Sequence, residues 1–214
     1  MYKFLIISAY ISLIFLISIA LKKKNPSNKE LLRKIIHIGI GPLIPLAKYL
    51  EIQQTSALYF TLLITTLILI NYIYKIFPTI EDIERKSYGT LFYCLSLLIL
   101  IQLFWEKDPI SLIAGFFIMT FGDGFAGLIG KNIYSSNWTI FKQKKSFLGT
   151  LTMFLISLII VFFLCYFNNL NINTSYLIIP ITATILEQFS VIGIDNFIVP
   201  IASSIGFNLL ITKL

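Results

Sequence analysis

Apolar runs long enough to cross a lipid bilayer recur along the whole chain of 214 residues. About 20 residues of α-helix span a hydrocarbon core that is roughly 30 Å thick. Five strong runs and three weaker ones approach this length. The strong runs cover residues 4–21, 55–74, 88–105, 109–130 and 147–167, and the weaker ones cover 35–50, 175–192 and 197–211. The sequence therefore predicts an all-α fold, a polytopic transmembrane helical bundle of about 7–8 spans.

The polar intervals between these runs leave no room for a soluble domain. Only 13% of the residues are charged, whereas soluble domains carry about a quarter. The longest polar intervals, 22–34 and 131–145, are too short to bury a core of their own. We therefore expect residues 1–214 to form a single integral membrane domain. It would consist of a first transmembrane helix at 1–21, a basic cytoplasmic loop at 22–34, and a membrane bundle at 35–214 that would hold any catalytic site.

Basic residues gather in three intervals of the chain. If the N-terminus is outside and there are eight spans, intervals 22–34, 75–86 and 131–145 face the cytoplasm, and they hold 13 of the 17 lysines and arginines. Cytoplasmic loops of membrane proteins usually carry such an excess. The net charge of +7 then reflects the basic residues that orient the protein in the membrane. Anionic lipid headgroups are its expected partner, and nucleic acid is not. We expect a multi-pass protein of a bacterial inner membrane or a thylakoid, with its site on the cytoplasmic side.

Four groups of polar residues lie within or beside the apolar runs, all towards the expected cytoplasmic side. A charged side chain at the bilayer centre costs about 2.5–3.5 kcal/mol, so such residues are candidates for function. The first group contains Arg33, Lys34 and His37. Arg33 and His37 are four residues apart and share a helix face. Alternatively, the cations extend to the membrane interface and His37 packs against or caps a helix.

The second group surrounds Asp123, which is flanked by Gly122 and Gly124 and followed by Gly127 and Lys131. Mg²⁺ typically binds one or two carboxylates and completes its shell with phosphate oxygens and water. Glycines let a ligand or another helix approach the backbone closely. Helix packing alone would explain the glycines but not the carboxylate. Asp123 is therefore a candidate ligand of Mg²⁺.

The third group lies at the start of the run at 147–167 and contains Lys144, Lys145, Ser146 and Gly149. The backbone N–H groups of a helix start and nearby lysine side chains together suit a phosphate. The alternative is that the lysines only fix the orientation of the loop.

The fourth group contains Glu187, Asp195 and Asn196. Two carboxylates and an amide near one membrane face suit a second metal ion, or removal of the proton from an alcohol. The alternative is a helix cap at Asp195 and a Glu187 paired inside the bundle. Taken together, the four groups offer carboxylates for Mg²⁺, lysines for phosphates and a membrane setting for an apolar substrate. They indicate phosphoryl or nucleotidyl transfer.

In this order, the motifs resemble the polyprenol kinase family of CTP-dependent lipid-alcohol kinases, which includes phytol kinases and dolichol kinases. The resemblance covers about residues 30–205, and the small size of the chain is most similar to the phytol kinases. The motifs that carry it are Arg33-Lys34-x-x-His37, Glu84-Arg85-Lys86-Ser87-Tyr88-Gly89, Gly122-Asp123-Gly124-x-Ala126-x-x-x-Gly130-Lys131, Lys144-Lys145-Ser146-x-x-Gly149-Thr150, and Glu187 through Asp195-Asn196-x-x-x-Pro200.

The resemblance implies transfer of phosphate from a nucleoside triphosphate, typically CTP, to an isoprenoid alcohol, with Mg²⁺ as cofactor. With phytol, the phytyl monophosphate formed would feed tocopherol, phylloquinone or chlorophyll side-chain salvage. On this basis we assign catalytic roles to Asp123, Lys145, Glu187, Asp195 and His37, and metal binding to Asp123 and Asp195. The nucleotide site would comprise Gly122, Gly124, Gly127, Lys131, Lys144, Ser146, Gly149, Arg33 and Asn196.

Two other functions compete with this hypothesis. A cytidylyltransferase that makes a CDP-lipid is distantly similar, but such enzymes usually end in an Asp-Arg-x-Asp element, and no Arg follows Asp195-Asn196 here. A membrane transporter would account for intramembrane Asp123 and Glu187. A transport path, however, needs polar groups at the bilayer midplane, whereas these gather towards one face.

Overall fold

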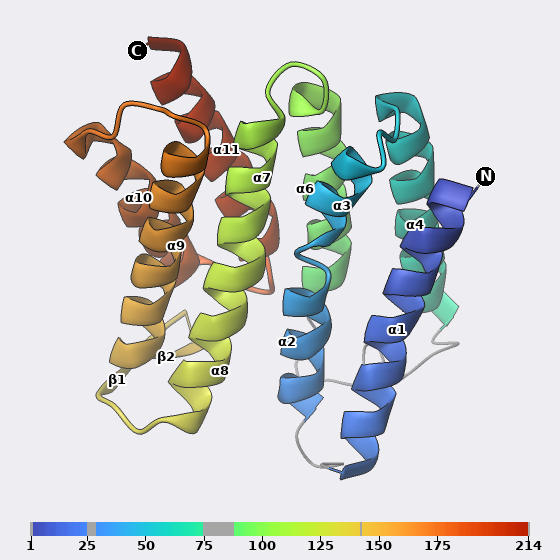
Figure 1. The fold of residues 1–214 in the computed structure, drawn as a ribbon. Coiled ribbons are helices and arrows are strands. Elements are labelled where there is room, and N and C mark those ends of the chain that lie inside the picture. The colour runs from blue at the N-terminus through green and yellow to red at the C-terminus, as the bar shows by residue number, and fades with distance from the viewer. Residues whose placement is uncertain (1, 25–28, 75–87, 142, 214) are drawn as a thin grey trace.

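A computed structural model describes residues 2–24, 29–74, 88–141 and 143–213. Its long helices lie side by side and form a single bundle (Figure 1). The only sheet among the described residues is one two-stranded hairpin. The predicted all-α helical bundle is therefore confirmed. The motif residues Glu84, Arg85, Lys86 and Ser87 lie outside the described residues, as does Lys142.

The N-terminal part of the bundle contains four helices, α1 (Tyr2–Lys24), α2 (Lys29–Gly39), α3 (Leu43–Tyr49) and α4 (Gln54–Tyr74). The weak apolar run at 35–50 is thus not one helix, because a turn at residues 40–42 separates α2 from α3. Pro42 has no N–H group, and its ring opposes continuation of the preceding helix. At Gly41, an added Cβ would lie 2.5 Å from Cζ of Phe121, so the turn approaches the middle of the bundle closely.

The rest of the chain forms the other side of the bundle. Its elements are α6 (Gly89–Phe104), α7 (Pro109–Phe117), the π-helix η1 (Ile118–Asp123), α8 (Gly124–Asn132), α9 (Phe147–Phe167), the short 3-10 helix η2 (Thr174–Leu177), α10 (Ile178–Phe189) and α11 (Asp195–Lys213). Helices α7, η1 and α8 follow one another without a break and cross the centre of the bundle (Figure 1).

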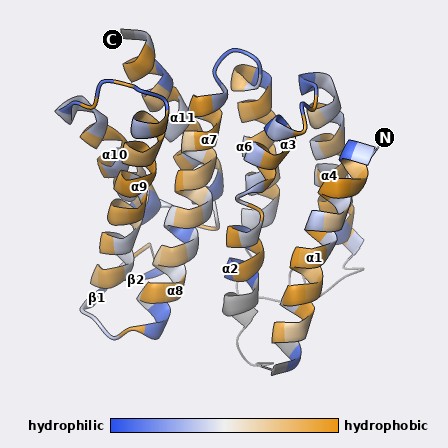
Figure 2. Cartoon of the chain, in the orientation of Figure 1, coloured by the Kyte–Doolittle hydropathy of each residue, from blue (hydrophilic) through white to orange (hydrophobic). Residues whose placement is uncertain are grey.

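Five helical segments among the described residues are long and apolar enough to cross a membrane: 2–21, 54–74, 109–132, 147–167 and 195–212. Helix α6 is apolar but shorter. Hydrophobic residues line most of each helix, and hydrophilic ones gather towards the helix ends and loops (Figure 2). These features fit a protein that lies in the membrane. The expected number of spans, 7–8, stays a prediction, as does the orientation of the bundle.

The core consists of two clusters of buried side chains on either side of the α7–η1–α8 segment. Leu100, Trp105 and Phe116 belong to one cluster, and Met153 and Phe207 belong to the other. Of the apolar stretch of this central segment, 61% is buried inside the protein, compared with 17% of that of the first span. The segment that carries Asp123 is therefore surrounded by protein.

A β-hairpin joins α8 to α9 at one end of the bundle. Strand β1 (Asn137–Ile140) pairs antiparallel with β2 (Gln143–Ser146). The sequence analysis expected only a loop here. The indole N–H of Trp138 donates a hydrogen bond to Oε1 of Gln188 at 3.3 Å, which ties the hairpin to α10. Because β2 runs directly into α9, the hairpin also fixes the position of Lys145.

Candidate functional site

Lys34 and Asp123 form a buried ion pair between α2 and the end of η1. Nζ of Lys34 lies 2.6 Å from Oδ2 of Asp123 and also donates to the main-chain oxygen of Asp123 at 3.0 Å. The two side chains are only 7% and 12% exposed. Gly127, one turn further along, leaves space for the lysine, since an added Cβ there would lie 2.4 Å from Cε of Lys34. The negative charge of Asp123 is thus compensated inside the bundle.

His37 also contacts the carboxylate of Asp123. Its Nε2 is 3.4 Å from Oδ2 of Asp123 and 3.2 Å from the main-chain oxygen of Met119. The imidazole ring also meets the ring of Tyr93 edge-on, with 4.9 Å between centroids. Lys34 and His37 are three residues apart on one face of α2. The described contacts to Asp123 come from Lys34 and His37. Arg33, which the sequence analysis placed in the nucleotide site, is half-buried beside them, and that role stays a prediction.

A second ion pair joins the hairpin to α10. The ammonium group of Lys145 contacts Oε1 of Glu187 and donates to the main-chain oxygen of Glu187 at 2.7 Å. Both side chains are 11% exposed. Gln188 donates to Oε2 of Glu187 at 2.8 Å and to the hydroxyl of Thr150 at 2.7 Å. Both oxygens of Glu187 therefore already accept hydrogen bonds.

Asp195 lies near both ion pairs. It is the first residue of α11, is half-buried, and lies within electrostatic range of Asp123, Lys34, Lys145 and Glu187. We call these five residues together with His37 the carboxylate cluster. It holds three carboxylates and two ammonium groups, and the guanidinium group of Arg33 also acts on Asp123. Such a group suits the binding of a cation or of a proton.

Asn196 lies next to Asp195 and is 2% exposed. Its Nδ2 donates to the main-chain oxygen of Gly89 at 3.1 Å, which fixes the orientation of the amide. Its Oδ1 is buried and has no hydrogen-bond partner within the described structure. Buried acceptors without a partner are rare in proteins, and they often mark the place of a water or an ion. This oxygen is thus a candidate contact for a bound group beside Asp195.

Glycines predicted to bind nucleotide contact protein in this structure. An added Cβ would lie 2.8 Å from Sδ of Met153 at Gly122, and 2.4 Å from Cγ1 of Ile38 at Gly124. At Gly149 it would lie 2.9 Å from the hydroxyl of Ser146. These positions let α2, α8 and α9 approach closely, as the packing alternative expected. A role in nucleotide binding stays a prediction for all of them.

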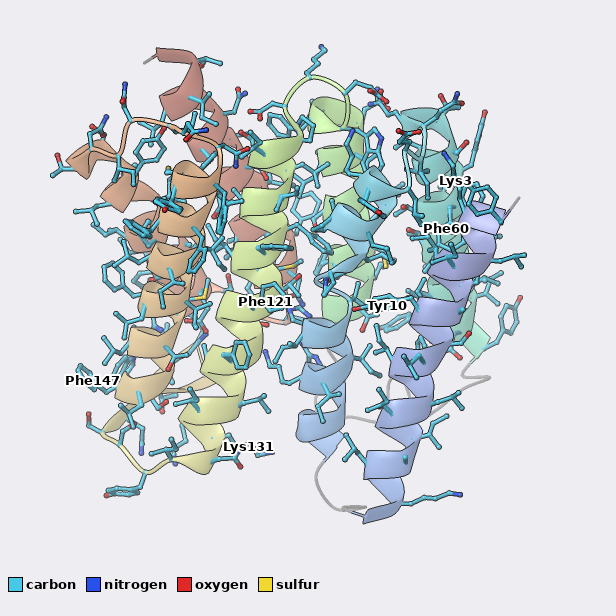
Figure 3. All side chains as sticks on the ribbon, in the orientation of Figure 1. Lys3, Tyr10, Phe60, Phe121, Lys131 and Phe147 are labelled. Carbon is cyan, nitrogen blue, oxygen red and sulfur yellow. The ribbon has the colours of Figure 1, made fainter. Side chains whose placement is uncertain are left out.

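The start of α9 differs from the sequence expectation, because its first N–H groups are already bonded. The N–H of Phe147 donates to the main-chain oxygen of Ser136 at 2.9 Å, that of Leu148 to the hydroxyl of Ser135 at 3.3 Å, and that of Gly149 to the hydroxyl of Ser146 at 3.2 Å. A phosphate would therefore rely on nearby side chains. Lys131 and Lys144 are both exposed at this end of the bundle, and Figure 3 shows Lys131 at the end of α8.

The cluster also fits Mg²⁺. Among the described residues there is no group of three or more histidine, cysteine or acidic side chains that would hold a metal by itself. Mg²⁺ does not need one, because it takes one or two carboxylates and fills its shell with phosphate and water. Asp123 and Asp195, which interact electrostatically, are the carboxylates that the sequence analysis named for it, and their role as ligands stays a prediction.

Sequence reasoning missed two residues of this site. Lys34 was part of the first motif but was not assigned a role, since only contact with Asp123 distinguishes it from its basic neighbours. Gln188 carried no signal apart from its position after Glu187, yet it links that carboxylate to α9 and to the hairpin. The π-helical geometry that ends at Asp123 was also unpredicted, although such helices are frequent at functional sites.

Comparisons with known proteins agree with the family resemblance. A protein named phytol kinase from Synechocystis sp. is 34% identical over 204 residues, which cover 92% of this chain and 87% of its own length. Phytol kinase 1, chloroplastic, of Arabidopsis thaliana is 29% identical, and the matched residues cover 67% of its length. Probable phytol kinase 2, chloroplastic, of Glycine max is also 29% identical, and the matched residues cover 66% of its length. No family model matches the chain, and no solved structure matches it significantly.

Proposed function

Because this chain belongs to the phytol kinase family, we propose that it transfers the γ-phosphate of a nucleoside triphosphate, CTP by preference, to the hydroxyl group of phytol. The chain is a kinase, a phosphotransferase with an alcohol acceptor. The product would be phytyl monophosphate, for use in tocopherol, phylloquinone or chlorophyll side-chain salvage. The carboxylate cluster is the observation that carries this proposal, because it joins acids and ammonium groups inside an apolar bundle.

Phosphoryl transfer needs positioning and charge neutralisation more than covalent help from the protein. Lys34 and Lys145 supply two ammonium groups within the cluster, and Arg33 lies beside them. In the proposed reaction they offset the negative charge of the phosphates. The two ion pairs keep both lysines in place before the nucleotide arrives, so little reorganisation is needed.

Asp195 is the proposed base. Both oxygens of Glu187 accept hydrogen bonds from Lys145 and Gln188, which leaves Asp195 as the less occupied carboxylate of the two. In the step we propose, the alcohol oxygen forms a bond to the γ-phosphorus while its proton passes to Asp195. The bond between that phosphorus and the bridging oxygen breaks, and the bridging oxygen leaves with the electron pair on the nucleoside diphosphate.

Because Asp195 is assigned here as the base, Asp123 is the residue that would hold Mg²⁺, with phosphate oxygens and water completing the shell. When bound, this ion neutralises charge on the transferred phosphate. The protein contributes Lys34 and His37, which hold the carboxylate of Asp123 in one orientation.

The test is a transfer assay in membranes that contain the protein. The membranes are incubated with Mg²⁺, phytol and γ-labelled CTP, ATP or UTP, next to the same membranes with Asp123→Asn. We expect label in an organic-soluble monophosphate with the wild-type chain and at least about a hundredfold less with the variant. Equal recovery of both chains in the membrane fraction would show that the variant is inserted.

Two results would overturn the proposal. Formation of a CDP-lipid from phosphatidate and α-labelled CTP, with no labelled alcohol, would identify a cytidylyltransferase. The absence of any product in both assays, from a chain that is inserted and folded, would favour transport as the function.

A further inference from the structure

An apolar groove of about 300 Å³ lies on the outer surface of the bundle between α9 and α10. Its α9 wall consists of Phe147, Thr150, Leu151 and Phe154, which recur at helical spacing and share one face. Phe147 lies at the start of α9, at the outer edge of the bundle (Figure 3). The volume is at the lower end of the range for ligand pockets, about 300–1,000 Å³.

The α10 wall consists of Ile181, Thr184 and Ile185. Although two threonines line the groove, their hydroxyl groups are turned back onto their own helices. Thr184 donates to the main-chain oxygen of Pro180 at 2.7 Å, and Thr150 donates to that of Ser146 at 3.0 Å. The groove therefore presents methyl groups and rings, and it suits a hydrocarbon ligand.

One end of the groove meets the polar site. Gln188 follows Ile185 by three residues on α10, and its amide donates to the hydroxyl of Thr150. The same amide donates to Glu187, whose carboxylate contacts Lys145 in the carboxylate cluster. A chain that lies in the groove would thus place its polar end beside Gln188 and its tail towards Ile181 and Phe154.

We propose that this groove holds the isoprenoid chain of the alcohol substrate, with the hydroxyl group at the Gln188 end. This inference rests on the proposed function and adds the place where the tail binds. Exposed residues such as Ile181, at 46%, open the groove towards the lipid, so an alcohol can enter sideways from the bilayer. The methyl branches of an isoprenoid meet the two threonine methyl groups and the rings of the α9 wall.

The test fills the far end of the groove and compares acceptors of different length. Ile181 lies seven residues from Gln188, about 10 Å along α10. Ile181→Trp places a bulky ring where the chain of phytol would lie, whereas the five-carbon alcohol 3-methylbut-2-en-1-ol ends before it. We expect the apparent KM for phytol to rise about tenfold or more, from the loss of roughly two buried CH₂ groups. The KM for the five-carbon alcohol and that for CTP should stay unchanged.

Ile159→Trp is the matched control, since Ile159 is a lipid-facing residue of α9, 50% exposed, that does not line the groove. It should leave both acceptors unaffected. Phosphorylation of the five-carbon alcohol also reports that each variant is folded. If the wild-type chain phosphorylates neither alcohol, the proposed function itself fails. If it phosphorylates both and Ile181→Trp behaves like Ile159→Trp, the groove holds only membrane lipid and this inference is wrong.

Discussion

Lys34 and Asp123 are 89 positions apart in the sequence, yet the lysine Nζ lies 2.6 Å from the aspartate Oδ2 in the interior of the bundle. The contact joins α2 to the point where η1 gives way to α8. Each charge would be costly alone at this depth, because little water reaches it. The pair therefore holds a reactive carboxylate in an apolar bundle and at the same time fastens α2 to the central segment.

The first prediction removes one partner of this pair. Lys34→Met should destabilise the protein by about 3–5 kcal/mol, because it leaves the carboxylate of Asp123 buried without a cation. The double variant Lys34→Met/Asp123→Asn should recover most of the lost stability, since neither charge remains, but no transfer activity. Melting in detergent and the phosphate-transfer assay measure the two quantities. An unchanged melting temperature for Lys34→Met would contradict the pairing.

The second prediction concerns Gly127, which leaves space for Lys34. In Gly127→Ala the new methyl group would lie 2.4 Å from Cε and 2.9 Å from Nζ of the lysine. The flexible end of Lys34 can move aside, so we expect a small loss of stability, about 1 kcal/mol. Transfer activity should fall about tenfold or more, because the ammonium group stays paired with Asp123 but shifts from the position in which it would meet the phosphates.

Gly206→Ala is the control for this change. Its new methyl group would meet only Cγ1 of Ile179 at 3.8 Å, an ordinary contact. Both activity and melting temperature should stay near those of the wild-type chain. If Gly127→Ala and Gly206→Ala retain equal activity, the position of Lys34 does not matter to the reaction.

The third prediction tests the packing of α7 against α11. At Gly115 an added Cβ would lie 2.1 Å from the hydroxyl oxygen of Ser204 and 2.2 Å from the main-chain oxygen of Pro200. The backbone of α11 cannot move aside as a lysine side chain can, so the helices must separate. Gly115→Ala should destabilise the protein by about 1–3 kcal/mol or more. Thermal melting would show this as a lowered transition, and a transition equal to that of Gly206→Ala would refute the close packing.

The helical bundle was predictable because apolar length is a local property of the sequence. The breaks within it were harder to place. The turn between α2 and α3 depends on Pro42 and on the contact between Gly41 and Phe121, which lies far away in the chain. The hairpin at 137–146 was missed because four-residue strands between two long helices leave almost no periodic signal.

The sequence also selected most residues of the cluster, since Asp123, Glu187 and Asp195 are carboxylates within or beside apolar runs. It did not predict their partners. Lys34 and Arg33 are neighbours with the same charge, and only the direction of each side chain from α2 decides which one meets Asp123. Likewise, helix packing and nucleotide binding favour the same glycines, so spacing alone does not separate the two functions.

The last prediction separates the two candidate bases. Asp195→Asn should lower kcat about 10²–10⁴-fold with little change in the KM for phytol, because it removes the proton acceptor and leaves the groove intact. Glu187→Gln instead leaves the ammonium group of Lys145 without its carboxylate, so its main effect should be a lowered melting temperature. Steady-state kinetics and melting of both variants measure the difference, with Glu51→Gln, an exposed residue between α3 and α4, as a control away from the cluster. If Glu187→Gln loses as much kcat as Asp195→Asn while it melts like the wild-type chain, Glu187 is the base and the assignment of Asp195 is wrong.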